Sequence, residues 1–228
     1  LSKTIDHEKK SNAVLPPSIS LNDVTICFDG KEKPVVERIS AVVPGGSQLG
    51  ILGASGSGKT TILNSILGIL TPTRGTVTVG NQLAAEIFKR GDLKIGYVGP
   101  DPYLIEGTIA ENLKYGSRGV TTNDDLWSSL KDAHLMERVR EFPLGLDQPL
   151  NEHADVLSAG QKQRLSLARA FLSKPDLLIL DEASANLDEE TEKEIAKSIV
   201  TLRGKCTTII VSHRQGILAN VDQILALT

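Results

Sequence analysis

The spacing of apolar residues changes along the chain, and these changes predict strands and helices in turn. Residues 18–30 and 35–43 mix β-branched and polar residues and each run into a glycine-containing turn. They are expected to form an antiparallel β-layer near the N-terminus. Residues 177–180 and 207–211 are short, continuous apolar runs, which are typical of strands buried on both faces. Residues 60–70 place apolar side chains at helical intervals instead.

The remaining segments extend this alternation. Residues 107–172 have a mainly helical pattern with breaks at 115–119 and 142–155, and residues 189–202 form an amphipathic helix. The other predicted strands are 47–52, 76–79, 94–98 and 224–227. Strands that alternate with helices predict the α/β class with a mostly parallel sheet.

The ends of the sequence bear on domain organisation. Residues 1–17 are polar and end in Pro16 and Pro17, which predicts a flexible linker before one large domain at 18–228. The chain starts without a methionine and stops within an apparent strand, so we expect it to be a piece of something longer. No apolar run approaches the roughly 18–20 residues that span a bilayer.

Charge and composition argue against several kinds of site. The formal net charge is −3, which gives no support to non-specific nucleic-acid binding, so no nucleic-acid partner is expected. Cys27 and Cys206 are far apart and are expected to be reduced, semi-buried thiols rather than a disulfide or a metal site. The acidic run from Asp188 through Glu194 is expected to be mostly a solvated helix start.

A glycine-rich loop carries the most specific chemistry in the sequence. Residues 53–60, GASGSGKT, fit the pattern G-x-x-x-x-G-K-[ST], with a predicted strand before them and a predicted helix after them. Glycines let successive backbone N–H groups point at phosphate oxygens, and the helix adds its positive end. Lys59 would place a cation near the β- and γ-phosphates, and the Thr60 hydroxyl would ligate Mg²⁺. The loop therefore predicts a nucleoside triphosphate site.

Two acids follow the apolar strand at 177–180. In α/β proteins, ligands bind where parallel strands emerge from the sheet, so Asp181 is predicted to hold Mg²⁺. Glu182 is predicted to act as the base for, or the orienter of, the attacking water. The alternative is that these acids merely cap the following helix, which is the weaker interpretation once the phosphate loop is considered.

Further segments resemble the motifs of one family. The stretch LSAGQKQRLSLARA at 157–170 resembles the signature motif of ABC ATPases, and it precedes the acidic strand, as in that family. Residues 184–188 resemble the family's D-loop, and 212–214 resemble its switch-histidine loop. Phe28 matches the aromatic position that stacks on adenine. The resemblance runs from about residue 19 to the end of the chain.

The resemblance is closest to the exporter branch. Residues 106–113, EGTIAENL, look like the exporter segment after the Q-loop, and 142–158 look like the stretch before the signature. Within that stretch, Glu152 matches a position used near the coupling helices of the membrane domain. This implies a nucleotide-binding domain on the cytoplasmic face of a membrane, as part of a transporter whose transmembrane domain precedes it.

The resemblance also implies a fold and a set of site residues. The fold is a P-loop NTPase with a RecA-like parallel core, an N-terminal antiparallel β-layer and an inserted helical subdomain at about 101–170. Two such domains, identical or different, would pack head to tail around ATP, and hydrolysis would release them. The catalytic residues would be Lys59, Glu182 and His213. The residues expected to bind ATP are Phe28, Gly53, Ala54, Ser55, Gly56, Ser57, Gly58, Lys59, Thr60, Thr61, Ser158, Gly160, Gln161 and Asp188.

The sequence departs from the family at one important position. An ungapped match of IGYVGPDPYLIEGTI places Pro100 where the family has a glutamine that ligates Mg²⁺ and senses the membrane domain. Proline offers neither a side-chain oxygen nor a backbone N–H. Neighbouring Asp101 is a minor candidate to substitute. Ala159 replaces a common glycine of the signature, and little effect is expected from one methyl group.

Two other functions are alternatives. A DNA-repair or translation ATPase of the same family would carry a coiled-coil insertion or a second cassette, and neither is present in the sequence. A non-catalytic, nucleotide-gated regulatory module is disfavoured by Glu182 and mildly favoured by Pro100. The sequence does not predict the transported substrate.

Overall fold

The computed structural model describes residues 15–227 except 29, 31, 32, 118, 152 and 153. Glu152 and most of the predicted linker lie outside these residues. In chain order the elements are β1 (Ile19–Ile26), β2 (Val36–Val43), β3 (Gln48–Gly53), α1 (Lys59–Ile66), β4 (Arg74–Val79), β5 (Gln82–Leu83), α2 (Ala84–Arg90), β6 (Ile95–Val98), β7 (Gly107–Thr108), α3 (Ile109–Lys114), α4 (Asn123–Asp132), α5 (Met136–Glu141), a 3₁₀ turn (Gly145–Asp147), β8 (Pro149–Leu150), α6 (Ala159–Leu172), β9 (Leu177–Asp181), α7 (Glu189–Val200), β10 (Thr207–Val211), α8 (Gln215–Leu218) and β11 (Gln223–Leu227).

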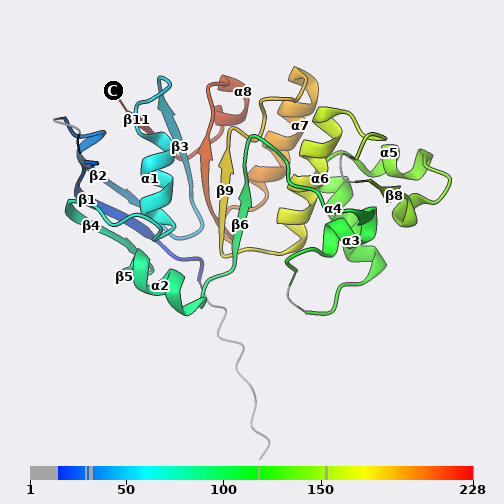
Figure 1. The fold of residues 1–228 in the computed structure, drawn as a ribbon, viewed down its shortest axis with the longest axis horizontal. Coiled ribbons are helices and arrows are strands. Elements are labelled where there is room, and N and C mark those ends of the chain that lie inside the picture. The colour runs from blue at the N-terminus through cyan, green and yellow to red at the C-terminus, as the bar shows by residue number, and fades with distance from the viewer. Residues whose placement is uncertain (1–14, 29, 31–32, 118, 152–153, 228) are drawn as a thin grey trace, which may run out of the picture.

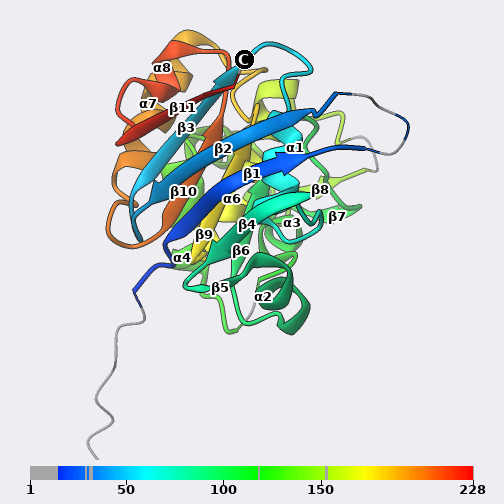
Figure 2. The same cartoon turned by 90° about the vertical axis from the view of Figure 1, so that its left-hand side faces the viewer.

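Two larger sheets organise the described chain. Five strands in the order β11-β3-β10-β9-β6 form a sheet in which every neighbouring pair is parallel. Four strands in the order β2-β1-β4-β5 form an antiparallel sheet. Figure 2 shows β2, β1 and β4 side by side in front of the parallel strands. The α/β prediction, with a parallel core and an N-terminal antiparallel layer, is confirmed.

The central strands are apolar throughout because both faces of the parallel sheet are covered. Side chains on a strand alternate between its faces. Leu177 and Ile179 of β9 accordingly join one hydrophobic core, which contains β1 and α1, whereas Leu178 and Leu180 join the other, which contains α6 and α7. Figure 1 shows α1 between the antiparallel layer and the parallel strands, with α6 and α7 beyond β9.

Helices α3 and α4 pack on α6, and one arginine ties this region together. Arg169 of α6 donates from Nε to the Asn112 carbonyl oxygen (2.7 Å) and from Nη1 to the Tyr103 carbonyl oxygen (2.7 Å). Its guanidinium also lies 5.4 Å from the centre of the Tyr115 ring. Residues 107–172 are mainly helical, as the spacing of their apolar residues predicts, apart from the two-residue strands β7 and β8.

Three smaller findings correct or extend the sequence analysis. Strand β5 and helix α2 were not predicted, because residues 82–90 are too short a stretch to show a clear period. Both cysteines are free, but Cys27 is exposed rather than semi-buried, whereas Cys206 is buried. Among the described residues, the helices are all too short or too polar to cross a membrane.

The position of Gly75 gives a test of the antiparallel layer. It lies in β4 beside an irregularity in the pairing with β1, and its φ is 81°. A Cβ there would run into the carbonyl oxygens of Asn22 and Asp23, whereas a Cβ at Gly116 (φ 76°) meets no atom within 4 Å. Both substitutions by alanine should cost about 1–2 kcal/mol for the left-handed backbone, and Gly75→Ala should cost about 1–3 kcal/mol more from crowding.

Urea denaturation of the two variants measures this difference in the free energy of unfolding. Equal losses would mean that β1 and β4 do not approach each other as described.

Candidate functional site

The phosphate-loop sequence connects β3 to α1, and its glycines are required by the backbone. Gly56 and Gly58 have φ angles of 83° and 92°, a region that other residues rarely adopt. A Cβ at Gly58 would come within 2.6 Å of the Val36 side chain. Gly58 is also the N-cap of α1, and no side chain among the described residues caps this helix. The first N–H groups and the positive end of α1 are therefore left for an anion.

Lys59 lies folded across the start of this loop. Its Nζ donates hydrogen bonds to the carbonyl oxygens of Gly53 (2.7 Å) and Ala54 (2.9 Å). The side chain is largely buried, at 9% exposure for the residue. The positive charge is therefore held next to the loop by the backbone itself.

The loop opens onto a hollow of about 440 Å³ that four separate segments line. The residues that form its wall are Phe28, Val35, Ser55, Gly56, Gly58, Lys59, Thr60, Thr61, Asp181, Glu182 and His213. Ten of these eleven are predicted site residues, and only Val35 is not. The hollow thus combines one lysine, two carboxylates, a histidine and an exposed aromatic ring.

Asp181 ends β9 at the edge of the hollow. Burial raises the pKa of its carboxyl group, while a hydrogen bond from Tyr97 and the charge of Lys59 act in the opposite direction. The Tyr97 hydroxyl donates to Asp181 Oδ2 over 3.2 Å. Burial, followed by the negative charge of Asp181, raises the pKa of Tyr97 to about 12. Tyr97 therefore remains a protonated donor at neutral pH.

The donor chemistry of the hollow fits a magnesium ion. The Thr60 hydroxyl and the Asp181 carboxylate both line it, and both offer the hard oxygen ligands that Mg²⁺ prefers. Mg²⁺ is commonly held by one or two protein oxygens together with substrate phosphates, so a third acid is not needed.

Glu182 and His213 meet across the ends of two parallel strands. His213 Nε2 lies 3.1 Å from Glu182 Oε1. Glu182 has a φ of 53°, a left-handed conformation in which its N–H donates to the Val211 carbonyl oxygen of β10 (2.9 Å). Helix α7 begins only at Glu189 and is capped by Asp188. The alternative that Asp181 and Glu182 cap this helix is therefore wrong.

The other predicted nucleotide contacts do not line this hollow. Ser158 caps α6: its Oγ accepts from the Gln161 N–H (3.3 Å), and its own N–H donates to Gln161 Oε1 (2.9 Å). Ser158 and Asp188 are exposed, and Gly160 packs so closely that a Cβ would lie 2.8 Å from the Asn186 carbonyl oxygen. In Figure 1, the start of α1 is separated from α6 by the strands of the parallel sheet.

Tyr97 is a residue of the site that its sequence context did not predict. It lies on β6, whose residues 95–98 pair with 177–180 of β9, and this pairing brings its hydroxyl to Asp181. The one relevant signal in the sequence was the predicted strand at 94–98, which contains Tyr97. Pro100, in contrast, is exposed and does not line the hollow.

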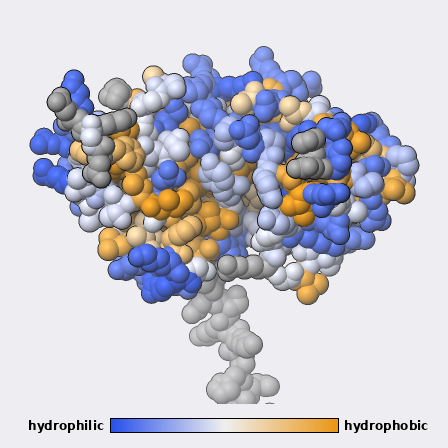
Figure 3. Space-filling view, in the orientation of Figure 1, coloured by the Kyte–Doolittle hydropathy of each residue, from blue (hydrophilic) through white to orange (hydrophobic). Residues whose placement is uncertain are grey.

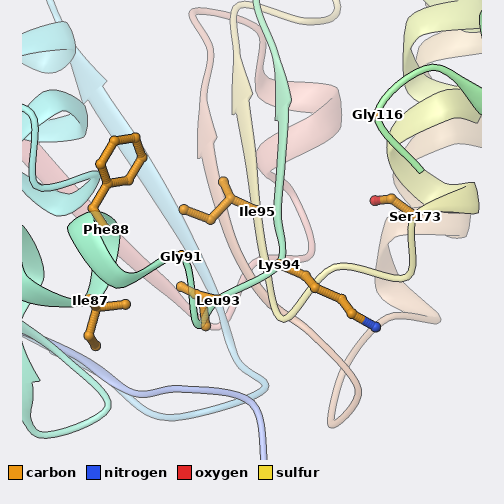
Figure 4. A pocket seen from close by; sticks show the side chains of 8 residues that line it. All are labelled: Ile87, Phe88, Gly91, Leu93, Lys94, Ile95, Gly116 and Ser173. Atoms are coloured by element: carbon orange, nitrogen blue, oxygen red, sulfur yellow. The ribbon is translucent and has the colours of Figure 1, made fainter. Parts of the chain in front are cut away.

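A second hollow, of about 320 Å³, lies away from these residues. Figure 4 shows Ile87 and Phe88 of α2 facing it on one side, and Ser173, at the end of α6, on the other. Among the residues that the structure describes, Lys94 is the one charged residue in its lining, and neither a carboxylate nor a phosphate-type loop contributes. Figure 3 shows that hydrophobic residues gather in the middle of this face of the molecule. The second hollow therefore lacks the chemistry of a nucleotide site.

Comparison with known proteins assigns the family. The family model described as ABC transporter matches residues 36–185. This chain belongs to the ABC transporter family. The matched segment contains the phosphate loop, the signature-like stretch and the two acids at the end of β9.

Three curated relatives have similar sequences. An uncharacterized ABC transporter ATP-binding protein from Bacillus subtilis is 34% identical over 97% of this chain. An ATP-dependent lipid A-core flippase from Vibrio cholerae is 33% identical over 91%, and a multidrug resistance ABC transporter ATP-binding and permease protein from Lactococcus lactis is 34% identical over 96%. The chain spans only 38%, 36% and 37% of their respective lengths.

A solved structure of a bacterial Atm1-family ABC exporter with ATP bound has the same fold. It superimposes with a TM-score of 0.83 and 29% identity over 95% of this chain and 38% of the exporter chain. Together with the family match, this establishes the P-loop NTPase fold. The chain is thus an ABC-type nucleotide-binding domain similar to those of ABC exporters.

The Tyr97–Asp181 contact yields a prediction about ionisation. The hydrogen bond favours the charged carboxylate, so Tyr97→Phe should raise the pKa of Asp181 further. Tyr103→Phe, at an exposed tyrosine outside the hollow, is the matched control. Titration of the carboxyl carbon by NMR measures both. An unchanged Asp181 pKa in Tyr97→Phe would show that the hydroxyl does not support this carboxylate.

Proposed function

We propose that this domain binds and hydrolyses ATP with Mg²⁺ to power export by a membrane transporter. The observation that carries the proposal is the convergence of the phosphate loop, two acids and a histidine on one hollow. Phe28, at the rim, would stack on adenine, and the loop N–H groups and Lys59 would hold the phosphates. Thr60 and Asp181 would hold the ion, which supplies charge neutralisation at the β- and γ-phosphates.

The reaction converts ATP and water into ADP and phosphate. The oxygen of water forms a bond to the γ-phosphorus as the bond between that phosphorus and the β–γ bridging oxygen breaks. Glu182 orients this water and accepts its proton, since its carboxylate stands next to the hollow. His213, whose Nε2 lies 3.1 Å from Glu182 Oε1, would hold this carboxylate and would contact the γ-phosphate. Catalysis is mainly positioning and charge stabilisation.

The site is completed by a second nucleotide-binding domain. Ser158, Gly160, Gln161 and Asp188 lie outside the hollow, so within one chain they cannot contact a nucleotide bound there. Ser158 and Asp188 are exposed, and Ser158 sits at the start of a fourteen-residue helix whose positive end favours an anion. Head-to-tail packing of two domains would place this helix start against the partner's γ-phosphate, so ATP would hold the pair together.

The further partner is the transmembrane domain of the same transporter. The relatives include a protein described as ATP-binding and permease, and this chain matches little more than a third of it. We place residues 18–228, with a helical subdomain at about 101–170, on the cytoplasmic face of the membrane. Cycles of ATP-driven closure and hydrolysis would then drive movement of the membrane part.

Two substitutions separate binding from hydrolysis. Glu182→Gln should retain ATP, because the phosphate loop is untouched, but should lower phosphate release by at least about 100-fold. Lys59→Ala should lose most ATP binding, whereas Lys89→Ala, at an exposed residue of α2, should change neither property. Binding is measured with a fluorescent ATP analogue, and hydrolysis by release of inorganic phosphate.

The regulatory alternative gives the opposite result in the same experiment. If the native chain with Mg²⁺ releases no more phosphate than Glu182→Gln, even after the transmembrane part is restored, the domain is a nucleotide-gated module. If native protein and Lys59→Ala both fail to retain ATP, nucleotide binding itself is refuted.

The departure at Pro100 predicts a gain of function. Restoring glutamine by Pro100→Gln adds an oxygen ligand that proline cannot supply, so turnover of Mg-ATP should rise, by about tenfold if roughly 1.4 kcal/mol of transition-state stabilisation is regained. ATP affinity should change little. Pro102→Gln, two residues away, is the control. Identical turnover in the native chain and in Pro100→Gln would show that this position does not limit hydrolysis.

A further inference from the structure

Arg214 connects the two loops that follow β9 and β10. It comes directly after His213, and its guanidinium donates from Nη2 to the Ala185 carbonyl oxygen (2.9 Å) and from Nη1 to the Leu187 carbonyl oxygen (2.7 Å). Both carbonyl oxygens belong to the segment that leads to Asp188. One side chain therefore joins the histidine loop to the loop that is exposed for a second domain.

A buried carboxylate fixes the guanidinium in this position. Arg214 Nη1 lies 2.9 Å from Glu192 Oε2, and Glu192 is only 4% exposed. The acidic run was expected to be mostly solvated, and Glu192 is a buried member of it. Its second oxygen, Oε1, accepts the Ile217 N–H (3.0 Å) within the single turn of α8. Both carboxylate oxygens are occupied, so the group has a single orientation.

The glycine after Gln215 makes room for this contact. A Cβ at Gly216 would lie 2.7 Å from Glu192 Oε1. The hydroxyl oxygens of Ser184 and Ser212, one in each loop, are a further 3.4 Å pair. The two loops are therefore joined at several points, and the fork of Arg214 makes the most hydrogen bonds between them.

We infer that Arg214 is a positioning residue for ATP hydrolysis. Through it, the position of the Asp188 segment fixes the position of His213, so that contact with a second domain at Asp188 aligns the histidine at the γ-phosphate. This inference rests on the proposed function. It predicts that loss of the fork slows hydrolysis without weakening ATP binding, because Arg214 does not line the nucleotide hollow.

The test removes the Arg214–Glu192 ion pair as a whole, so that neither charge is left buried without its partner. The double variant Arg214→Met/Glu192→Met should hydrolyse ATP about tenfold more slowly at an unchanged KM, because positioning acts on the transition state. The matched control is Lys193→Met/Glu189→Met, which removes an exposed ion pair from the same helix and should leave kcat unchanged. Thermal unfolding and ATP-analogue binding are recorded for each variant.

A second variant covers the case in which the double variant does not fold. Arg214→Lys keeps a positive charge beside Glu192, but a single ammonium group cannot bridge two carbonyl oxygens and a carboxylate as the planar fork does. Its kcat should also fall several-fold at constant KM. Native kcat in Arg214→Lys, or in a folded double variant, would overturn the inference.

A double-mutant cycle separates positioning from simple stabilisation of the fold. Asp188→Ser keeps an N-cap for α7 while removing the charge, and it should lower kcat in the native chain. In the Arg214→Lys background the same change should have much less effect, because the connection is already broken. Fully additive losses would overturn the inference. If the native chain shows no hydrolysis above Glu182→Gln, the proposed function fails instead.

Discussion

Strands β3, β10 and β9 lie side by side and parallel, so the loops that follow them leave the sheet at one edge. The phosphate loop follows β3, the histidine loop follows β10, and the two acids lie at the end of β9. Residues as far apart along the chain as Ser55 and His213 therefore meet around one hollow because of the strand order. The hydrophobic cores on both faces of the sheet hold the register of these strands. A shift of one residue would exchange the side chains on the two faces of a strand.

Each charged side chain at this edge of the sheet is held by a nearby polar partner. Lys59 is held by two backbone carbonyl oxygens, Asp181 by a tyrosine hydroxyl, and Glu182 by a histidine. Each group is fixed in position by the protein, and preorganised groups of this kind avoid the cost of reorientation during a reaction. Glu182 further adopts a left-handed backbone conformation, which the N–H bond to β10 sustains. Such strained positions are concentrated at functional sites.

The parts that the sequence predicted are those with a local signal. The apolar run at 177–180 and the loop at 53–60 each carry their own pattern, so the parallel core and most of the hollow could be located before the structure was known. Tyr97 could not, because its role depends on the pairing of β6 with β9. The burial of Glu192 could not be predicted for a similar reason. Within α7 it resembles its solvated acidic neighbours, and only the distant Arg214 explains its burial.

The capping arrangement at Ser158 affects what this residue can offer to a ligand. The Ser158 N–H already donates to Gln161 Oε1, and Ser158 Oγ already accepts from the Gln161 N–H. The hydroxyl hydrogen is then the group that can turn towards an incoming anion. The helix start is thus fully ordered before anything docks on it. Recognition there would need only the rotation of one O–H bond, with little entropy left to lose.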